Sequence, residues 1–390
     1  MIKVVFISNF LNHHQLPFCK EMIAMKVDFT FVATEDIPSE RKQLGYIDMN
    51  KKYDFVLTTY DNSNNVKNAI KISSEADIAI IGSAPTLFIK DRLKANKLTF
   101  RYNERILKEG IRKLMNPKNF YYYFVNNTIY RNKNFYLLAA SAYAPYDFSL
   151  IFSYPKKMIK WGYFIENANN NLDKLLEIKK KNKIVKIIWC GRLIPLKHPE
   201  LVIMLADFLK KKNYKFEINV VGSGEMLNLL KQTAIANNVD NCINFVGSVL
   251  SNDVCKYMNE ANIFIFTSDF NEGWGAVLNE AMNSACAIVA SHSIGSVPFL
   301  LKNNYNGFIY ENGNVLSFLD KVEKLMLNEN LRLFLGKNAY NYIKENYSAK
   351  EAAKRLIYLY NNDMDLSLIK DGVCSVAPVV SNKKMIDICK

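Results

Sequence analysis

The sequence predicts an α/β protein of two doubly wound domains, each built on a parallel sheet covered by helices. Short apolar runs alternate with amphipathic helical segments, which is the order of strands and crossover helices. The chain has 390 residues, more than one ordinary domain contains. Because a polar, Asn- and Lys-rich stretch separates two series of such runs, we expect two domains in sequence.

The first domain is expected at residues 1–165. Its predicted strands are short runs rich in β-branched and aromatic residues. They lie at 2–7, 28–33, 55–59, 78–82, 98–102 and 135–139. Helices are predicted between most of them, for example at 66–74 and at 17–25, where Pro17 suits the first position of a helix.

Residues 166–183 are predicted to form a linker, because they are polar and rich in Asn and Lys. The second domain is expected at 184–344. Its predicted strands lie at 185–189, 217–221, 243–246, 263–266 and 287–290. The chain then becomes helical. The tail at 363–390 is weakly patterned, with a loose extra strand expected at 377–380, and nothing in it indicates a function.

Composition narrows the class of protein. A hydrophobic content of 49% and a charged content of 23% are typical of a folded soluble protein. No apolar run is long enough to span a bilayer and no N-terminal signal pattern is present, so we expect a cytoplasmic location. The seven cysteines form no C-x-x-C pair and no metal-like grouping with the four histidines, so we expect reduced thiols and no metal site.

The net charge of +14 is concentrated in one region. Residues 90–160 hold roughly fifteen basic residues against four acidic ones, and aromatic residues are interleaved, as at 120–124. A basic, aromatic face suits an anionic membrane surface, here the inner face of the cytoplasmic membrane, or an anionic substrate. A solvated basic surface is the alternative. Because no nucleic-acid-binding motif is present, we expect no nucleic acid partner.

Three loops of the second domain follow predicted strands, where ligands bind in parallel sheets. The first loop carries Gly191, Arg192 and Lys197. An Arg fork and a Lys point charge suit neighbouring phosphate oxygens. The second loop carries Gly222 and Ser223 before a helix. Each loop alone also fits an ordinary glycine turn with solvated charges.

The third loop joins the strand at 263–266 to a predicted helix at 276–286. Gly273 and Gly275 let the backbone approach a ligand, and the helix start offers N–H groups to an anion. Glu272 on the loop and Glu280 early in the helix can bind hydroxyl groups on either side of a phosphate. Two solvated glutamates are the alternative. Together the three loops predict a nucleotide diphosphate site.

The first domain offers a second group of polar residues beyond predicted strands. Asn12, His13 and His14 follow the first strand, and Asn103 and Glu104 follow the strand at 98–102. We expect these side chains to line a crevice. The alternatives are ordinary loop polarity and, for Glu104, a carboxylate that faces a helix dipole.

The order and spacing of the three second-domain loops resemble glycosyltransferase family 4. The resemblance rests on Gly191-Arg192 with Lys197, on 222–225, and on 272–281, which resembles that family's paired-glutamate signature. It covers about 183–310. It implies a GT-B fold, with two facing Rossmann-like domains, a cleft between them, and helices at about 345–362 that complete the first domain.

The resemblance also implies an activity. The protein would be a retaining, metal-independent glycosyltransferase that needs no cofactor. It would move a sugar from a nucleotide-diphosphate sugar to a glycan or lipid-linked glycan acceptor, which fits bacterial surface polysaccharide biosynthesis. The alternatives are a GT-B sugar-nucleotide epimerase, a glycogen-synthase-like enzyme, or a non-enzymatic nucleotide or nucleic-acid binding module. The paired glutamates argue against the last, because a protein that binds the phosphate backbone of a nucleic acid gains nothing from two carboxylates in its groove.

Residue roles follow from the same resemblance. Arg192 and Lys197 would hold the donor diphosphate and act in catalysis, and Glu280 would hold the ribose. Glu272, with the backbone of 273–275 around Trp274, would hold the sugar and the distal phosphate.

The base would lie near Gly247 and Val249. Many relatives carry a first-domain histidine where this sequence reads 101–105, which contains none. Asn103 or Glu104 would then act in catalysis, or His13 or His14 would approach from the acceptor-binding loop with Asn12.

Overall fold

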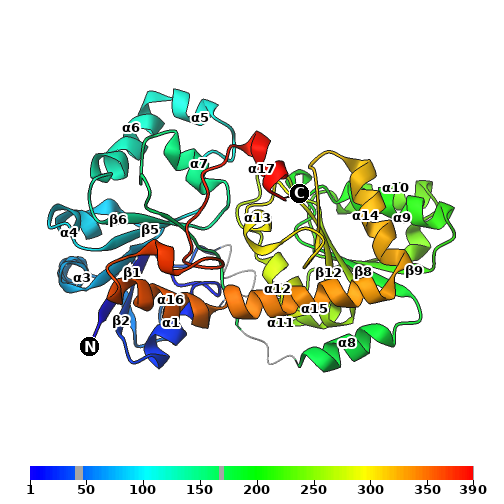
Figure 1. Ribbon diagram of the computed structural model, residues 1–390, viewed down its shortest axis with the longest axis horizontal. Coiled ribbons are helices and arrows are strands. Elements are labelled where there is room, and N and C mark those ends of the chain that lie inside the picture. Colours follow the sequence, from blue (N-terminus) through cyan, green and yellow to red (C-terminus); the bar gives the residue numbers. More distant parts are fainter. Residues whose placement is uncertain (40–46, 167–170, 390) are drawn as a thin grey trace. The chain divides into compact units, whose positions relative to one another are not determined.

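The computed structural model describes residues 1–39, 47–166 and 171–389 (Figure 1). The chain divides into two compact units. Unit 1 comprises Met1–Glu166 and Ser348–Val380, and unit 2 comprises Asn167–Tyr347 and Ser381–Lys390. Each unit is a parallel sheet with helices packed on it, as the alternating sequence pattern predicted.

Unit 1 has a seven-stranded sheet, among the described residues, in the order β3-β2-β1-β4-β5-β6-β7. All its paired strands are parallel. The strands are β1 (Lys3–Ser8), β2 (Asp28–Ala33), β3 (Val56–Thr58), β4 (Ile78–Ile81), β5 (Thr99–Asn103), β6 (Phe135–Ala139) and β7 (Met158–Lys160). The sequence pattern did not predict β7, because it has only three residues, ends on a lysine and follows two more.

Helices of unit 1 connect these strands. They are α1 (Leu16–Ala24), α3 (Ser63–Glu75), α4 (Lys90–Lys94), α5 (Arg112–Met115), α6 (Pro117–Asn126), α7 (Ala144–Ser149) and α16 (Ala349–Asn361). α16 comes from the far end of the chain and packs on α1 (Figure 1). Its buried face consists largely of alanine and leucine, which allows close packing.

Unit 2 has a six-stranded parallel sheet, within the same described ranges, in the order β10-β9-β8-β11-β12-β13. The strands are β8 (Val185–Cys190), β9 (Phe216–Val221), β10 (Ile243–Gly247), β11 (Ile263–Phe266), β12 (Ala287–Ser291) and β13 (Phe308–Tyr310). β11 and β12 are fully buried, as their unbroken apolar runs predicted. β13 is a short strand that the sequence pattern did not predict.

The helices of unit 2 cover both faces of this sheet (Figure 1). They are α8 (Leu172–Lys180), α9 (Glu200–Lys211), α10 (Leu227–Ala236), α11 (Ser251–Glu260), α12 (Val277–Asn283), α13 (Val297–Leu300), α14 (Val315–Leu327), α15 (Glu329–Asn346) and α17 (Asn382–Cys389).

Helix α8 lies where we predicted a linker. Leu175 packs with Ala285 and Tyr340. Lys179 is buried, and its Nζ donates to the carbonyl oxygens of Met258 (3.1 Å), Asn259 (3.2 Å) and Ala261. A buried ammonium at the end of α11 satisfies carbonyls that the helix leaves open. The polar composition of 172–180 therefore reflects a helix with one structural lysine, not a linker.

The tail contributes to both units. Val376 forms an antiparallel bridge with Ile159 of β7, one residue before the expected loose strand. Helix α17 then packs against α13 in unit 2. All seven cysteines are free thiols. No described helix combines the length and the apolar character that a bilayer span requires.

A buried arginine joins elements of unit 1. Arg92, 1% exposed, donates to the carbonyl oxygens of Ser73 and Ala76 (2.6 Å each), Asp77 (2.8 Å) and Leu98 (2.5 Å). Burial lowers the pKa of its guanidinium to about 10. The planar donor fork therefore ties the end of α3 to the start of β5.

Replacing this arginine should destabilise unit 1. We expect Arg92→Met to lower its free energy of unfolding by about 3–5 kcal/mol, because buried carbonyl oxygens lose their donor. Thermal unfolding followed by circular dichroism measures the change. Lys90→Met, on the exposed side of the same helix, is the control and should stay within about 0.5 kcal/mol. Equal unfolding midpoints for the two variants would contradict this role.

Candidate active site

The strand order of unit 2 fixes where a ligand can bind. β9 and β10 extend the sheet on one side of β8, and β11, β12 and β13 extend it on the other. In such sheets ligands bind at the carboxyl ends of the strands where the order reverses. The loops after β8 and β11 meet there. They are the loops that carry Lys197 and Glu272.

Lys197 and Glu272 form an ion pair at this point. Lys197 Nζ donates to Glu272 Oε2, and the two side chains are 14% and 13% exposed. Thr267 holds the loops together, because its Oγ1 accepts from Trp189 Nε1 (2.9 Å) and donates to the carbonyl oxygen of Lys197 (2.6 Å). A cation and a carboxylate predicted to contact the same donor are therefore adjacent.

His198 connects the same two loops. Its Nδ1 lies 2.7 Å from Glu200 Oε1, and its Nε2 lies 3.4 Å from Asp269 Oδ2. The hydrogen bond to Glu200 raises the pKa of His198, with support from the charges of Glu200 and Asp269 and opposition from burial. Glu272 N donates to the carbonyl oxygen of Asp269 (3.1 Å), so the imidazole braces the turn that presents Glu272.

Close backbone contact explains the glycines after β9. Gly222 has φ +135°, and a Cβ there would lie 1.9 Å from the carbonyl oxygen of Gly191. Gly222 N donates to the carbonyl oxygen of Gly247 (2.8 Å), and Leu193 N donates to that of Ser223 (2.9 Å). The glycine is therefore required for packing between loops, whether or not a phosphate also lies there.

The other predicted donor residues lie at the same edge of the sheet. Ser223 Oγ is 2.6 Å from Ser248 Oγ, which brings the loops after β9 and β10 together beside Val249. Arg192 is exposed, and within the described ranges no hydrogen bond or ion pair holds its guanidinium. This arginine can therefore reorient toward an anion.

Glu280 lies in the first turn of α12. Burial raises its pKa to about 7, so its carboxyl group titrates near neutral pH. Burial, followed by the nearby Glu280 charge, also raises the pKa of Cys190. A carboxyl group with a shifted pKa in the first turn of a helix beside the strand ends is a candidate ligand contact.

The loop before α12 buries the ring of its tryptophan. Trp274 is fully buried, and its Nε1 donates to Asn279 Oδ1 (2.9 Å). Gly275 has φ +80°, and a Cβ there would lie 2.5 Å from Phe266 Cζ. The Trp274 side chain is therefore committed to the core, and ligand contact by the backbone of 273–275 stays a prediction.

In unit 1 the strand order reverses between β1 and β4. His14 follows β1, and Glu104 follows β5. Tyr163, which follows β7, brings them together: its hydroxyl donates to Glu104 Oε1 (2.5 Å), and its ring stacks on His14 (5.1 Å between centroids). Lys108 Nζ lies 2.5 Å from Glu104 Oε2. Both oxygens of the predicted catalytic carboxylate are therefore engaged.

The remaining first-domain candidates shape the same loops. Asn12 Oδ1 accepts from His14 N (3.0 Å) and Gln15 N (3.2 Å), which orders the start of α1. The rings of His13 and His14 lie 3.8 Å apart. Asn103 Nδ2 donates to the carbonyl oxygen of Glu104 (2.7 Å).

Sequence reasoning did not select Tyr163, Lys108, His198 or Ser248. Tyr163 follows the unpredicted strand β7, so no pattern pointed to it. Lys108 lies four residues after Glu104, a spacing that could have indicated an ion pair. In the described parts of the chain, no three His, Cys, Asp or Glu side chains form a group that could hold a metal ion.

The pKa of His198 should exceed its ordinary value of about 6.5. A group whose folded pKa is raised adds stability that is complete below the unfolded pKa and is lost as pH rises through the folded pKa. NMR titration of the imidazole measures the pKa, and His198→Asn, which tolerates the φ of +47°, identifies the signal. Glu200→Gln should return the pKa toward 6.5. An unchanged pKa would rule out the bridging role.

Known proteins are similar to this chain over the region that contains the candidate donor loops. Residues 170–342 match the family model for glycosyl transferases group 1. An uncharacterised glycosyltransferase of Methanocaldococcus jannaschii is 35% identical over 183 residues, 47% of this chain and 46% of the relative. CapM of Staphylococcus aureus, a capsular polysaccharide biosynthesis glycosyltransferase, is 26% identical over 193 residues, 50% of each chain. The chain covers about half the length of these curated relatives.

The fold has counterparts among solved structures. HepE of Anabaena, solved in complex with UDP, superposes with a TM-score of 0.69 at 12% identity, over 93% of this chain and 100% of that chain. The two parallel sheets with their helices thus match a GT-B glycosyltransferase structure, which confirms the predicted fold class. Residues 170–342, which carry the predicted donor loops, are similar to glycosyl transferases group 1, in line with the resemblance found in the sequence.

Proposed function

We propose that the protein is a retaining, metal-independent glycosyltransferase that transfers a sugar from a nucleotide-diphosphate sugar to a glycan or lipid-linked glycan. The observation that carries this proposal is the paired Lys197 and Glu272, with Glu280, at the strand-order reversal of a group 1 glycosyl transferase domain. Relatives such as CapM support a role in bacterial surface polysaccharide biosynthesis.

The donor would separate the ion pair. Lys197 and the unrestrained Arg192 would bind the diphosphate, while Glu272 would accept hydrogen bonds from hydroxyl groups of the sugar. The leaving diphosphate gains negative charge as its bond to the anomeric carbon breaks, and two cations next to it would stabilise that charge without a metal ion. Glu280, once ionised, would accept hydrogen bonds from the ribose hydroxyl groups.

The acceptor would bind to unit 1. An acceptor hydroxyl forms the new bond to the anomeric carbon and must lose its proton. Because Tyr163 and Lys108 engage both oxygens of Glu104, this carboxylate would orient the acceptor rather than remove the proton. The departing phosphate oxygen would then take it, which fits retention by attack on the same face. The His14–Tyr163 stack offers an aromatic edge for a sugar ring.

Titration calorimetry with UDP, GDP and ADP tests the donor site. We expect one diphosphate to bind, with or without EDTA, and Arg192→Ala to weaken it by about tenfold or more because a charge-assisted contact is lost. The affinity should fall as pH drops below about 7, since Glu280 becomes protonated, and Glu280→Gln should remove that dependence. Lys212→Ala, away from these loops, is the control.

The outcomes separate the parts of this proposal. Absence of binding by any of the three diphosphates, in protein that unfolds cooperatively, would contradict the donor site. Loss of binding in EDTA would contradict metal independence. A transfer assay that yields product of inverted configuration would contradict retention.

We also propose that unit 1 associates with an anionic membrane surface from the cytoplasmic side. Helices α5 and α6 contain no buried residue, and they expose Met115 (76%), Tyr121 (67%) and Tyr122 (61%). Residues 110–160 hold eight Lys and Arg and a single acidic residue, Asp147, which is buried beside Arg105. Exposed aromatic rings among cations suit the headgroup region of an anionic bilayer.

Replacing Met115, Tyr121 and Tyr122 together by serine should weaken sedimentation with phosphatidylglycerol vesicles by roughly tenfold, because apolar surface no longer enters the bilayer. The matched control replaces the exposed Leu229, Leu316 and Leu327 of unit 2 by serine and should bind normally. Equal loss in both variants, or equal binding to phosphatidylcholine vesicles, would contradict a specific anionic docking face.

A further inference from the structure

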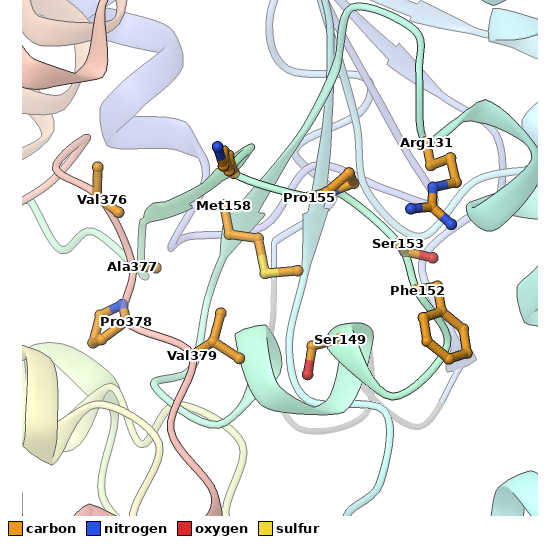
Figure 2. Close-up of a pocket in the computed structure, with 11 residues that line it drawn as sticks. Arg131, Ser149, Phe152, Ser153, Pro155, Met158, Val376, Ala377, Pro378 and Val379 are labelled. Carbon is orange, nitrogen blue, oxygen red and sulfur yellow. The ribbon is translucent and has the colours of Figure 1, made fainter.

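Unit 1 contains a pocket of about 450 Å³ that the proposed transfer reaction does not use. Figure 2 shows Phe152 and Arg131 on one side of it, the segment 376–379 on the other, and Met158 between them. Seven of its eleven lining residues are apolar, two are cations and none of these described residues is acidic. The volume falls in the range that accommodates a small organic ligand.

One wall of the pocket is a loop in an uncommon conformation. Phe152, Tyr154 and Lys156 have φ of +55°, +53° and +58°, which bulky side chains rarely adopt. The loop is held there because the Tyr154 hydroxyl donates to Asn127 Oδ1 (2.6 Å) and Thr128 Oγ1 donates to the carbonyl oxygen of Ile151 (2.7 Å).

This conformation has a consequence at the surface. It leaves the Phe152 ring 69% exposed at the edge of the pocket, although an aromatic ring in water is unfavourable. A fold that maintains both the strained backbone and the exposed ring indicates a ligand that contacts them.

The opposite wall is the segment 374–379, called here the strap. It lies along β7: Cys374 N donates to the carbonyl oxygen of Lys160 (2.9 Å), and Ala377 N donates to that of Met158 (3.0 Å). The pairing ends at Pro378, which has no N–H to donate. Val376 and Val379 are each 53% exposed, so this wall also presents apolar surface to the solvent.

The charged residues of the pocket indicate which polar group its ligand would carry beside an apolar part. Arg131 and Lys156 both line the pocket. Arg131 follows directly from the turn after α6, and the loop at 151–154 is bonded to the end of α6 through Asn127 and Thr128. The pocket therefore lies next to the end of the exposed aromatic helix α6.

The position of the pocket argues against its binding the end of the acceptor that carries the reacting hydroxyl. Met158 begins β7, whereas Tyr163 of the candidate acceptor site follows its carboxyl end. The two residues are five positions apart, with β7 between them. An occupant of the pocket therefore serves attachment and does not supply the reacting hydroxyl.

We propose that this pocket binds a hydrocarbon chain of an anionic bilayer phospholipid, whose phosphate pairs with Arg131 and Lys156. The inference rests on the membrane association proposed above and adds a defined lipid site to it. The chain would cover Phe152, Met158 and the two valines of the strap, and the phospholipid would fix unit 1 on the membrane beside α6.

The test uses the full chain and a short-chain phosphatidylglycerol below its micellar concentration, so that no bilayer is present. We expect saturable binding at a single site and about tenfold weaker binding in Phe152→Asn and in Lys156→Asn, since each loses one part of the contact. Asparagine tolerates positive φ, so both variants should fold. Leu327→Asn, with equal exposure (69%), and Lys26→Asn, with φ +59°, are the matched controls.

Several results would overturn the lipid site. They are the absence of saturable binding by the wild-type protein, equal binding of glycerol phosphate, which lacks chains, and equal loss in the pocket and control variants. UDP, GDP and ADP binding is measured on the same samples. Lost lipid binding with retained diphosphate binding would reject the pocket and leave the transferase proposal standing, and the reverse result would reject the donor site alone.

Discussion

Parallel pairing of β8 with β11 is the constraint on which the unit 2 site depends. The pairing places Ile187 beside Ile263, and the strands then diverge into the loops that carry Lys197 and Glu272. These residues are 75 positions apart in sequence, and only the sheet makes them neighbours. Thr267 extends the contact beyond the last paired residue by bonding to both Trp189 and the Lys197 carbonyl. The ion pair is thus a consequence of strand order.

The same geometry gives several site residues a structural role as well. Gly222 allows one loop to approach the carbonyl oxygen of Gly191, and the Trp274 ring fills the core beneath the Glu272 loop. Such contacts fix the backbone before any ligand binds, which limits the entropy lost on binding. Arg192 is the contrast, since it is exposed and no described hydrogen bond or ion pair fixes its guanidinium.

Unit 1 places its polar site candidates and its apolar pocket at opposite ends of its strands. Polar candidates such as His14 and Glu104 gather at carboxyl ends, around Tyr163. The apolar pocket lies at the start of β7, next to the basic and aromatic α6. The proposed lipid site and the proposed acceptor site thus lie at opposite ends of β7.

The sequence by itself determined the fold class, most strands and the positions of the loops that carry the candidate site, because apolar periodicity and glycine placement are local properties. Thus 28–33, 135–139 and 263–266 were predicted as strands with the bounds that they have. It could not determine what depends on contacts between distant residues. The short strands β7 and β13 have little pattern of their own and are held by their neighbours. Tertiary structure alone decided that Glu104 is paired, that 172–180 is a helix with a buried lysine, and that Phe152 borders a pocket, because each requires segments that only the folded chain brings together.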